Sequence, residues 1–158
     1  MLPKPGTYAL ILLSRSEEDI QVGRLGRLKV KPGFYVYVGS AFGPGGVKAR
    51  ISHHKNISNH PRWHIDYLRA VTCLHGIWYT YDSVRREHQW AEIFARSRKA
   101  STPLGGFGSS DCRCKSHLTY YYSHPSIKSF SRKIHAQYYD HETVHMKKTI
   151  GSAKTHEK

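Results

Sequence analysis

The sequence predicts an α+β domain in which a small antiparallel sheet, with a core of about three strands, is flanked by helices. Strand-forming segments fill most of the first third of the chain, and residues 83–99 carry apolar side chains at helical spacing. A chain of 158 residues is long enough for one sizeable core but short for two. We therefore expect one domain over residues 1–123, followed by a tail over residues 124–158.

The individual elements follow from local patterns. Residues 6–13, GTYALILL, form a buried strand, and residues 20–40 hold one or two further strands interrupted by glycines, which predicts an antiparallel meander. Ser83 is the expected N-cap of the last and longest helix of the domain. The predicted helices cover residues 45–55, 59–70 and 83–99, and the last of these is the one that Ser83 caps. Two further strands are predicted over residues 71–81 and 117–123.

The tail differs in composition from the rest of the chain. From His124 onward it has seven Lys or Arg, five His and few large aliphatic residues. The spacing of its apolar residues predicts a short amphipathic helix over residues 126–138, with disorder from there to the end. The tail either adds salt-sensitive affinity for phosphate or is a simple flexible extension.

The chain is strongly basic, which restricts its partners. Twenty-five Lys and Arg against eleven Asp and Glu give a formal net charge of +14. This surplus favours nucleic acid as the partner, with an anionic membrane surface second. No apolar run approaches the length of a membrane span, and the N-terminal apolar stretch is expected to be a strand and not a signal peptide. Three cysteines, an odd number, favour a reducing, cytoplasmic setting.

Two polar residues share one face of the helix predicted over residues 45–55. Arg50 and His54 are four residues apart, beside the apolar stripe of this helix. They lie either at the margin of a buried surface, near the phenol of Tyr37, or on an ordinary solvated helix edge.

The long helix offers two carboxylates. Glu87 is in register with Trp90 and Phe94, at the start of the apolar face, whereas Glu92 lies on the polar face. A carboxylate in line with an apolar stripe is costly unless it is paired, hydrogen-bonded or bound to a metal. Glu87 is therefore the better functional candidate, and its alternative role is to stabilise the first turn of the helix.

These features occur in the order found in a known nuclease family. GTY at residues 6–8, YVG at residues 37–39, the Arg50–His54 pair and Glu87 resemble the GIY-YIG nuclease superfamily. The blocks GRLG, YVYVGSAFGPGG, RWHIDYL and GFGSSDCRCKSHL are similar to those of its small stand-alone branch, the DUF123 type, which also occurs fused to DNA-repair glycosylase domains. The resemblance covers roughly residues 5–122 and implies a GIY-YIG-like fold.

The resemblance implies a role for each of these residues. Tyr8 and Tyr37 would orient or deprotonate the water that attacks a phosphodiester, and Arg50 would neutralise charge on the phosphate. Glu87 would bind a single Mg²⁺ or Mn²⁺ ion, since one carboxylate with water and substrate oxygens suits these cations better than zinc. His54 would occupy the helix position that carries Tyr or His in the family. A phenol is a poor base unless a neighbouring cation, such as Arg50 or Lys48, or a metal-bound water lowers its pKa.

Two positions depart from the family pattern. Ser40 stands where many relatives have a lysine, and Lys48 on the following helix is a candidate replacement that contacts nucleic acid. The late asparagine of the family has no clear counterpart, and Ser109, Ser110 and Asp111 lie in the corresponding part of the chain, with Ser110 taken as the candidate for nucleic-acid contact. His64 is a further candidate for phosphate contact, unless it only caps or packs its helix.

The cysteines raise the question of a zinc site. Cys112, Cys114 and His117 are three local ligands of the zinc type, and Cys73 would have to supply the fourth. Their spacing is tighter than that of a typical zinc motif. The alternative is an ordinary junction between a loop and a strand.

The sequence therefore predicts a metal-dependent endonuclease that hydrolyses DNA phosphodiester bonds in repair or processing. DNA is favoured over RNA as the partner, and a DNA-repair glycosylase is a candidate protein partner. Glu92 is the fallback metal ligand. The alternative function is a non-catalytic nucleic-acid-binding module on the same scaffold.

Overall fold

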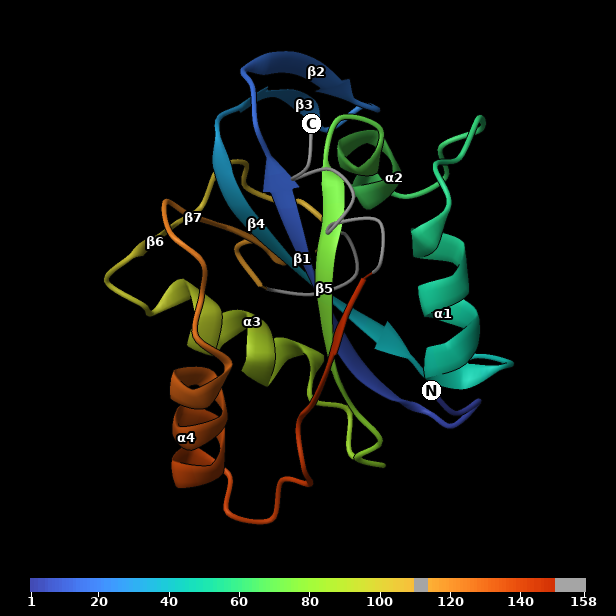
Figure 1. Cartoon of the computed structure of the whole chain (residues 1–158), viewed down its shortest axis with the longest axis vertical. Helices are drawn as coiled ribbons and strands as arrows, with labels where there is room; N and C mark the ends of the chain where they lie inside the picture. The colour runs from blue at the N-terminus through green and yellow to red at the C-terminus, as the bar shows by residue number, and fades with distance from the viewer. Residues whose placement is uncertain (110–113, 150–158) are drawn as a thin grey trace.

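The computed structural model describes residues 1–109 and 114–149, which form an α+β domain around one antiparallel sheet (Figure 1). The strand order is β6-β7-β4-β1-β5-β8, and β2 and β3 form a separate two-stranded ribbon. The predicted fold class is confirmed, but the sheet has six strands and not about three. The elements are, in chain order, β1 (Gly6–Ser14), β2 (Glu18–Val22), β3 (Gly26–Val30), β4 (Gly33–Ala41), α1 (Gly46–Lys55), α2 (His64–Arg69), β5 (Cys73–Thr80), α3 (Glu87–Ala95), β6 (Ala100–Ser101), β7 (Leu118–Tyr121), α4 (Ile127–Gln137) and β8 (His145–Lys148).

The central strand β1 is apolar on both faces. Tyr8, Leu10 and Leu12 belong to one hydrophobic cluster, and Ala9 and Ile11 belong to the other. Successive side chains of a strand point to opposite faces, so a strand covered on both sides must be apolar throughout. This explains why GTYALILL lacks the polar and apolar alternation of a strand with one face in water.

Each face of the sheet is covered by a different set of elements. α1, α2 and the β2-β3 ribbon contribute Val47, Ile65 and Leu28 to the cluster on the first face, which is the face of Tyr8. α3 and α4 contribute Trp90 and Phe130 to the cluster on the second face. The two pairs of helices accordingly lie on opposite sides of the sheet (Figure 1).

The helix predicted from residue 83 begins at Glu87. Its N-cap is Arg86, and Ser83 does not cap it. Asp82 explains the late start, because its carboxylate accepts hydrogen bonds from the backbone N–H of Val84 (2.9 Å) and from Nε of Arg86 (3.0 Å). These bonds hold the chain in a turn ahead of the helix.

The segment after residue 123 is part of the folded domain. Its first element, α4, agrees with the predicted helix and buries Phe130 and Ile134 in the cluster on the second face. Farther along, β8 pairs with β5 in antiparallel fashion. The prediction of disorder after residue 138 is therefore wrong for β8, while residues 150–158 lie outside the described part of the chain.

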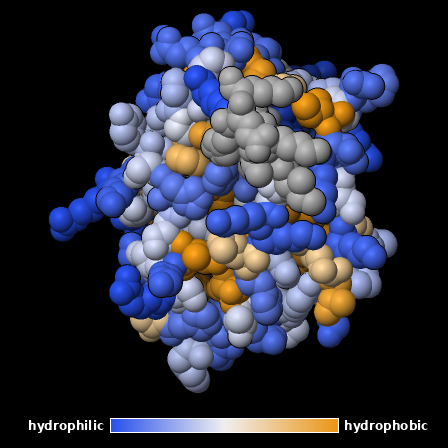
Figure 2. Space-filling model, in the orientation of Figure 1, coloured by the Kyte–Doolittle hydropathy of each residue, from blue (hydrophilic) through white to orange (hydrophobic). Residues whose placement is uncertain are grey.

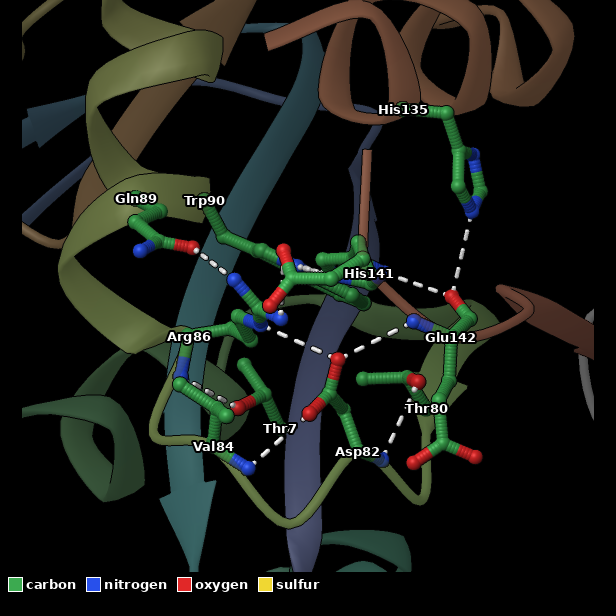
Figure 3. Close-up of polar contacts among 11 residues, drawn as sticks. Thr7, Thr80, Asp82, Val84, Arg86, Gln89, Trp90, His135, His141 and Glu142 are labelled. Carbon is green, nitrogen blue, oxygen red and sulfur yellow. Dashed lines mark hydrogen bonds and ion pairs between the residues drawn. The ribbon is translucent and has the colours of Figure 1, made fainter. Parts of the chain in front are cut away.

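Buried polar contacts hold this C-terminal segment against the rest of the domain (Figure 3). Oδ2 of Asp82 accepts hydrogen bonds from Nε of Arg86 and from the backbone N–H of Glu142, each at 3.0 Å. Nε1 of Trp90 donates to Nε2 of His141 at 2.9 Å. A buried carboxylate is stable only with such partners, so Asp82 links the start of α3 to the segment between α4 and β8.

The face of the protein drawn in Figure 2 is mainly polar. Figure 2, drawn in the orientation of Figure 1, shows hydrophobic residues only in small, separate patches. No helix within the described ranges has the length and apolar character needed to cross a membrane. The apolar side chains are mostly gathered in the two clusters around the sheet.

Candidate active site

Tyr8 and Tyr37 lie on the same face of two neighbouring strands. In the β1–β4 register Tyr8 is opposite Gly39 and Leu10 is opposite Tyr37, so the two tyrosines are diagonal neighbours. Gly39 provides space for Tyr8, since a Cβ at residue 39 would lie 2.3 Å from the Tyr8 hydroxyl oxygen. The YVG sequence thus supplies one tyrosine and the room that the other needs.

A hydrogen bond of 2.7 Å joins the Tyr8 hydroxyl to Nε2 of His54 in the interior of the protein. Burial lowers the pKa of the His54 imidazole to about 3, with a smaller contribution from His53. Burial also raises the pKa of the Tyr8 phenol well above its ordinary value. Both side chains are therefore neutral at pH 7, and the tautomer of the imidazole determines which of the two groups donates in this hydrogen bond.

Tyr37 lies near the same imidazole, with the ring centroids of Tyr37 and His54 6.2 Å apart. Burial raises the pKa of the Tyr37 phenol, the carboxylate of Glu87 raises it further, and Arg50 opposes both. Arg50 alone does not leave Tyr37 with a lowered pKa. The loss of hydration outweighs the attraction of the cation.

Arg50 lies at the margin of the buried face of α1, as the helical pattern predicts. Ile51 and His54 are buried on this helix, whereas Arg50 is half-buried. The guanidinium carbon of Arg50 lies 4.8 Å from the ring centroid of Trp63, the residue before α2. This cation–π contact restrains the arginine while its charge stays accessible to a ligand.

Glu87 and Glu92 have different surroundings, although both are on α3. The Glu87 side chain is 24% exposed, and its carboxylate lies 3.6 Å from Nδ1 of His117 and 3.8 Å from Nε2 of His88. Glu92 is exposed and pairs with Arg96 one turn farther along the helix. Glu87 therefore lies at the candidate site, whereas Glu92 belongs to the outer surface.

The structure brings most of the predicted site residues to one pocket of about 310 Å³. His54 is not among the lining residues and reaches the pocket through its hydrogen bond to Tyr8. The pocket has four walls, formed by β1 and β4, by α1, by the start of α2 and by the start of α3. The predicted residues that line it are Tyr8, Tyr37, Arg50, His64 and Glu87.

Four further residues line the pocket, namely Ser40, Arg62, Trp63 and Gly108. Arg62 adds a second cation, and its guanidinium carbon lies 5.8 Å from the Trp63 ring. The sequence PRWH, with basic and aromatic residues side by side, is a signal that could have identified both. The hydroxyl oxygen of Ser40 is buried and has no hydrogen-bond partner among the described residues, so it can bond to a ligand.

The three residues predicted to contact nucleic acid have different positions. His64 lines the pocket, where its Nδ1 accepts a hydrogen bond of 2.8 Å from the backbone N–H of Gly108. Lys48 is exposed on α1 and is not among the residues that line the pocket. Ser110 lies outside the described residues.

The cysteines are not arranged as the sequence suggests. Cys114 and His117 are close together, but the third ligand beside them is His88. Cys73 begins β5 opposite Leu13, at the end of β1 remote from the pocket, so it is not the fourth ligand. Cys112 lies outside the described residues.

Comparison with known protein families gives one match. A family model described as domain of unknown function DUF123 matches residues 7–139, a range that contains every residue lining the pocket. The matched range also includes α4, which lies beyond the predicted domain boundary. Neither the curated proteins nor the solved structures contain a match to this chain.

Proposed function

We propose that this chain, which belongs to the DUF123 family, is a metal-dependent endonuclease of the GIY-YIG type that hydrolyses DNA phosphodiester bonds. One observation carries the proposal: the two tyrosines, the arginine and the carboxylate that the resemblance requires all line a single pocket. They come from four separate elements of the fold. The formal net charge of +14 supports a nucleic-acid substrate.

The oxygen donors of the pocket fit a hard divalent cation. Mg²⁺ at phosphoryl-transfer sites typically binds one or two carboxylates together with water and phosphate oxygens, and Glu87 supplies one carboxylate. The histidines nearest to it lie 3.6 and 3.8 Å away, which is too far for a hydrogen bond. Bound to Glu87, Mg²⁺ or Mn²⁺ would neutralise charge on the scissile phosphate and on the leaving oxygen.

The cationic side chains of the pocket bind the phosphate itself. Arg50 and Arg62 both line the pocket and both lie near the ring of Trp63. Guanidinium groups match the geometry of phosphate oxygens and remain charged at any relevant pH. Ser40 adds a hydroxyl that can donate a further hydrogen bond. Together these groups place a phosphodiester in the pocket and stabilise the charge that develops during attack.

The tyrosines orient the attacking water. An imidazole with a pKa of about 3 is a weak base, so His54 contributes chiefly through its hydrogen bond to the Tyr8 hydroxyl. This fixes the Tyr8 hydroxyl and leaves its oxygen able to accept a hydrogen bond from water. The raised pKa values of the Tyr8 and Tyr37 phenols make a phenolate base unfavourable at pH 7. Positioning and charge neutralisation therefore account for the chemistry better than proton abstraction by tyrosine.

Cleavage of plasmid DNA by the full-length protein, with Mg²⁺ or Mn²⁺, tests the proposal. Glu87→Gln keeps the size of the side chain and removes its charge, so we expect cleavage to fall by about 10²–10³-fold. Glu92→Gln, the same substitution on the outer surface of the same helix, is the matched control and should cleave normally. Thermal unfolding of both variants checks that the fold is kept.

Three other outcomes have distinct meanings. A protein that cuts no plasmid, branched DNA or RNA with either metal contradicts the proposal. Salt-sensitive DNA binding without cleavage, unchanged in Glu87→Gln, favours the non-catalytic binding module. Cleavage that appears only after a DNA-repair glycosylase is added assigns the activity to a complex.

A further inference from the structure

Three metal-binding side chains meet beside the pocket, between the start of α3 and the segment before β7. The ligand atoms of His88, Cys114 and His117 all lie within 4.8 Å of one another. His88 is exposed, Cys114 is half-buried and His117 is buried. The cluster is therefore anchored in the protein on one side and open to an entering ion on the other.

The spacing of this cluster approaches that of a tetrahedral metal site. Zn–N bonds of about 2.0–2.1 Å and a Zn–S bond of about 2.3 Å place neighbouring ligand atoms about 3.3–3.6 Å apart. The exposed side chain of His88 can rotate to close the remaining distance. The rings of His88 and His117 are inclined by 54°, with their centroids 5.8 Å apart, so they are not stacked face to face.

Glu87 lies beside this set of three donors, outside the group whose ligand atoms are all within 4.8 Å of one another. Its Oε2 lies 3.6 Å from Nδ1 of His117, and its Oε1 lies 3.8 Å from Nε2 of His88. Both distances are close to the tetrahedral spacing. One carboxylate and one thiolate also balance the two charges of a divalent ion, which matters in a chain with a formal net charge of +14.

A second cluster of potential ligands, around His54 and Asp66, is used internally. The carboxylate of Asp66 accepts hydrogen bonds from the backbone N–H groups of Arg62 (2.9 Å) and Trp63 (3.1 Å) at the start of α2. Nε2 of His54 is bonded to Tyr8. The other carboxylate oxygen of Asp66 already pairs with Nε2 of His53 at 3.0 Å, so this cluster is the weaker candidate.

We propose that the chain has a site for Zn²⁺, or a divalent ion of similar softness, with four ligands: His88, Cys114, His117 and Glu87. Thiolate and imidazole ligands select such ions over Mg²⁺. The site therefore differs in chemistry from the hard-cation site proposed for the pocket. Because Glu87 belongs to both, zinc bound here draws the carboxylate away from the pocket and lowers Mg²⁺-dependent cleavage.

Titration with Co²⁺ tests this site without any measurement of DNA cleavage. Full-length protein is treated with a chelator under reducing conditions and titrated, and a thiolate-to-cobalt charge-transfer band reports a cysteine ligand. We expect Cys114→Ser to remove this band. His88→Ala should weaken Co²⁺ binding by about 10–100-fold or more, since even changes outside the ligand shell have effects of that size. Added Zn²⁺ should bleach the band.

Cys73→Ser is the matched control, because Cys73 lies at the far end of the sheet, and it should keep the wild-type spectrum. His88 is exposed, so its replacement should leave the fold intact, which circular dichroism of the metal-free variant checks. A folded wild-type protein that gives no band overturns the proposal. A band that persists in Cys114→Ser, or that is lost in Cys73→Ser, also overturns it.

Discussion

The hydroxyl of Tyr8 and Nε2 of His54 lie 2.7 Å apart, between the central strand and α1. Both side chains are almost completely buried. The phenol can reach over β4 only because residue 39 has no side chain. The GTY and YVG motifs thus have a physical explanation in this protein: a strand tyrosine, a glycine that makes room for it and a helix residue that fixes its hydroxyl.

Replacing Tyr8 by Phe should abolish this fixed hydroxyl while leaving the ring in place. We expect the rate of metal-dependent cleavage to fall by about 10²-fold, the loss typical of a misplaced reacting group. The free energy of unfolding should fall by only about 1 kcal/mol, since one buried hydrogen bond is lost. Plasmid cleavage and chemical denaturation measure the two effects separately.

Tyr35→Phe is the control for Tyr8→Phe. Tyr35 is buried on the same face of the sheet, but its hydroxyl accepts a hydrogen bond from the backbone N–H of Lys31, away from the pocket. This variant should lose a similar amount of stability and keep its activity. Equal losses of activity in both variants would contradict the role assigned to Tyr8.

Gly39→Ala should disturb the same arrangement from the neighbouring strand. The new methyl group would lie 2.3 Å from the Tyr8 hydroxyl, so the ring or the strand must move. We expect a loss of about 1–3 kcal/mol, the usual cost of overpacking, together with reduced cleavage. Gly43→Ala is the control, because a Cβ there meets nothing within 4 Å and stability should change by no more than about 0.5 kcal/mol. Unchanged stability in Gly39→Ala would show that Tyr8 does not need this space.

The sequence predicts the interior of this fold better than its edges. Strand β1 and helix α3 were identified because each repeats one pattern over many residues. Strands β6 and β8 were missed because they have only two and four residues, and their pairing depends on distant parts of the chain. The start of α3 was misplaced for a similar reason, since the side chain of Asp82 and not a local cap determines it.

For the candidate site too, the sequence predicts what depends on a local pattern and not what depends on contacts between distant segments. Arg50 and His54 could be paired from their spacing on one helix, and the position of Glu87 at the start of α3 followed from its register with the apolar face. The contact of Arg50 with Trp63 depends on the path of the chain between α1 and α2, which no short pattern specifies. The approach of His88 to Cys114 likewise depends on the packing of α3 against the segment before β7.

Asp82→Asn should loosen the C-terminal segment. Arg86 is 3% exposed, so loss of the carboxylate charge leaves a buried guanidinium whose one acidic partner among the described residues is the exposed Asp140 at 3.4 Å. We expect a loss of about 3 kcal/mol, at the lower end of the range for breaking a buried ion pair. Hydrogen exchange should become faster at the Glu142 amide, which donates to Asp82.

The exposed pair on α3 provides the comparison for Asp82→Asn. Glu92 and Arg96 are both more than half exposed, and Glu92→Gln should change stability by less than about 1 kcal/mol. Equal effects of the two substitutions would contradict the view that Asp82 anchors the segment before β8.

Stability should also depend on pH through His54. Burial keeps the pKa of this imidazole at about 3 in the folded protein, whereas in the unfolded chain it is close to 6.5. Between these two values the unfolded chain binds a proton that the folded protein does not, so stability falls as the pH falls from 6.5 towards 3. The loss attributable to His54 between pH 7 and pH 4.5 is about 2–3 kcal/mol.

His54→Gln keeps an acceptor for Tyr8 but cannot titrate, and denaturation curves at both pH values should show a smaller difference than in the wild type. A smaller slope of the same sign remains, because burial also lowers the pKa values of His64 and His141. The exposed His60, replaced by Gln, should leave the wild-type difference unchanged. An unchanged difference in His54→Gln would mean that this imidazole is hydrated and charged in the folded protein, which contradicts its burial as a neutral group.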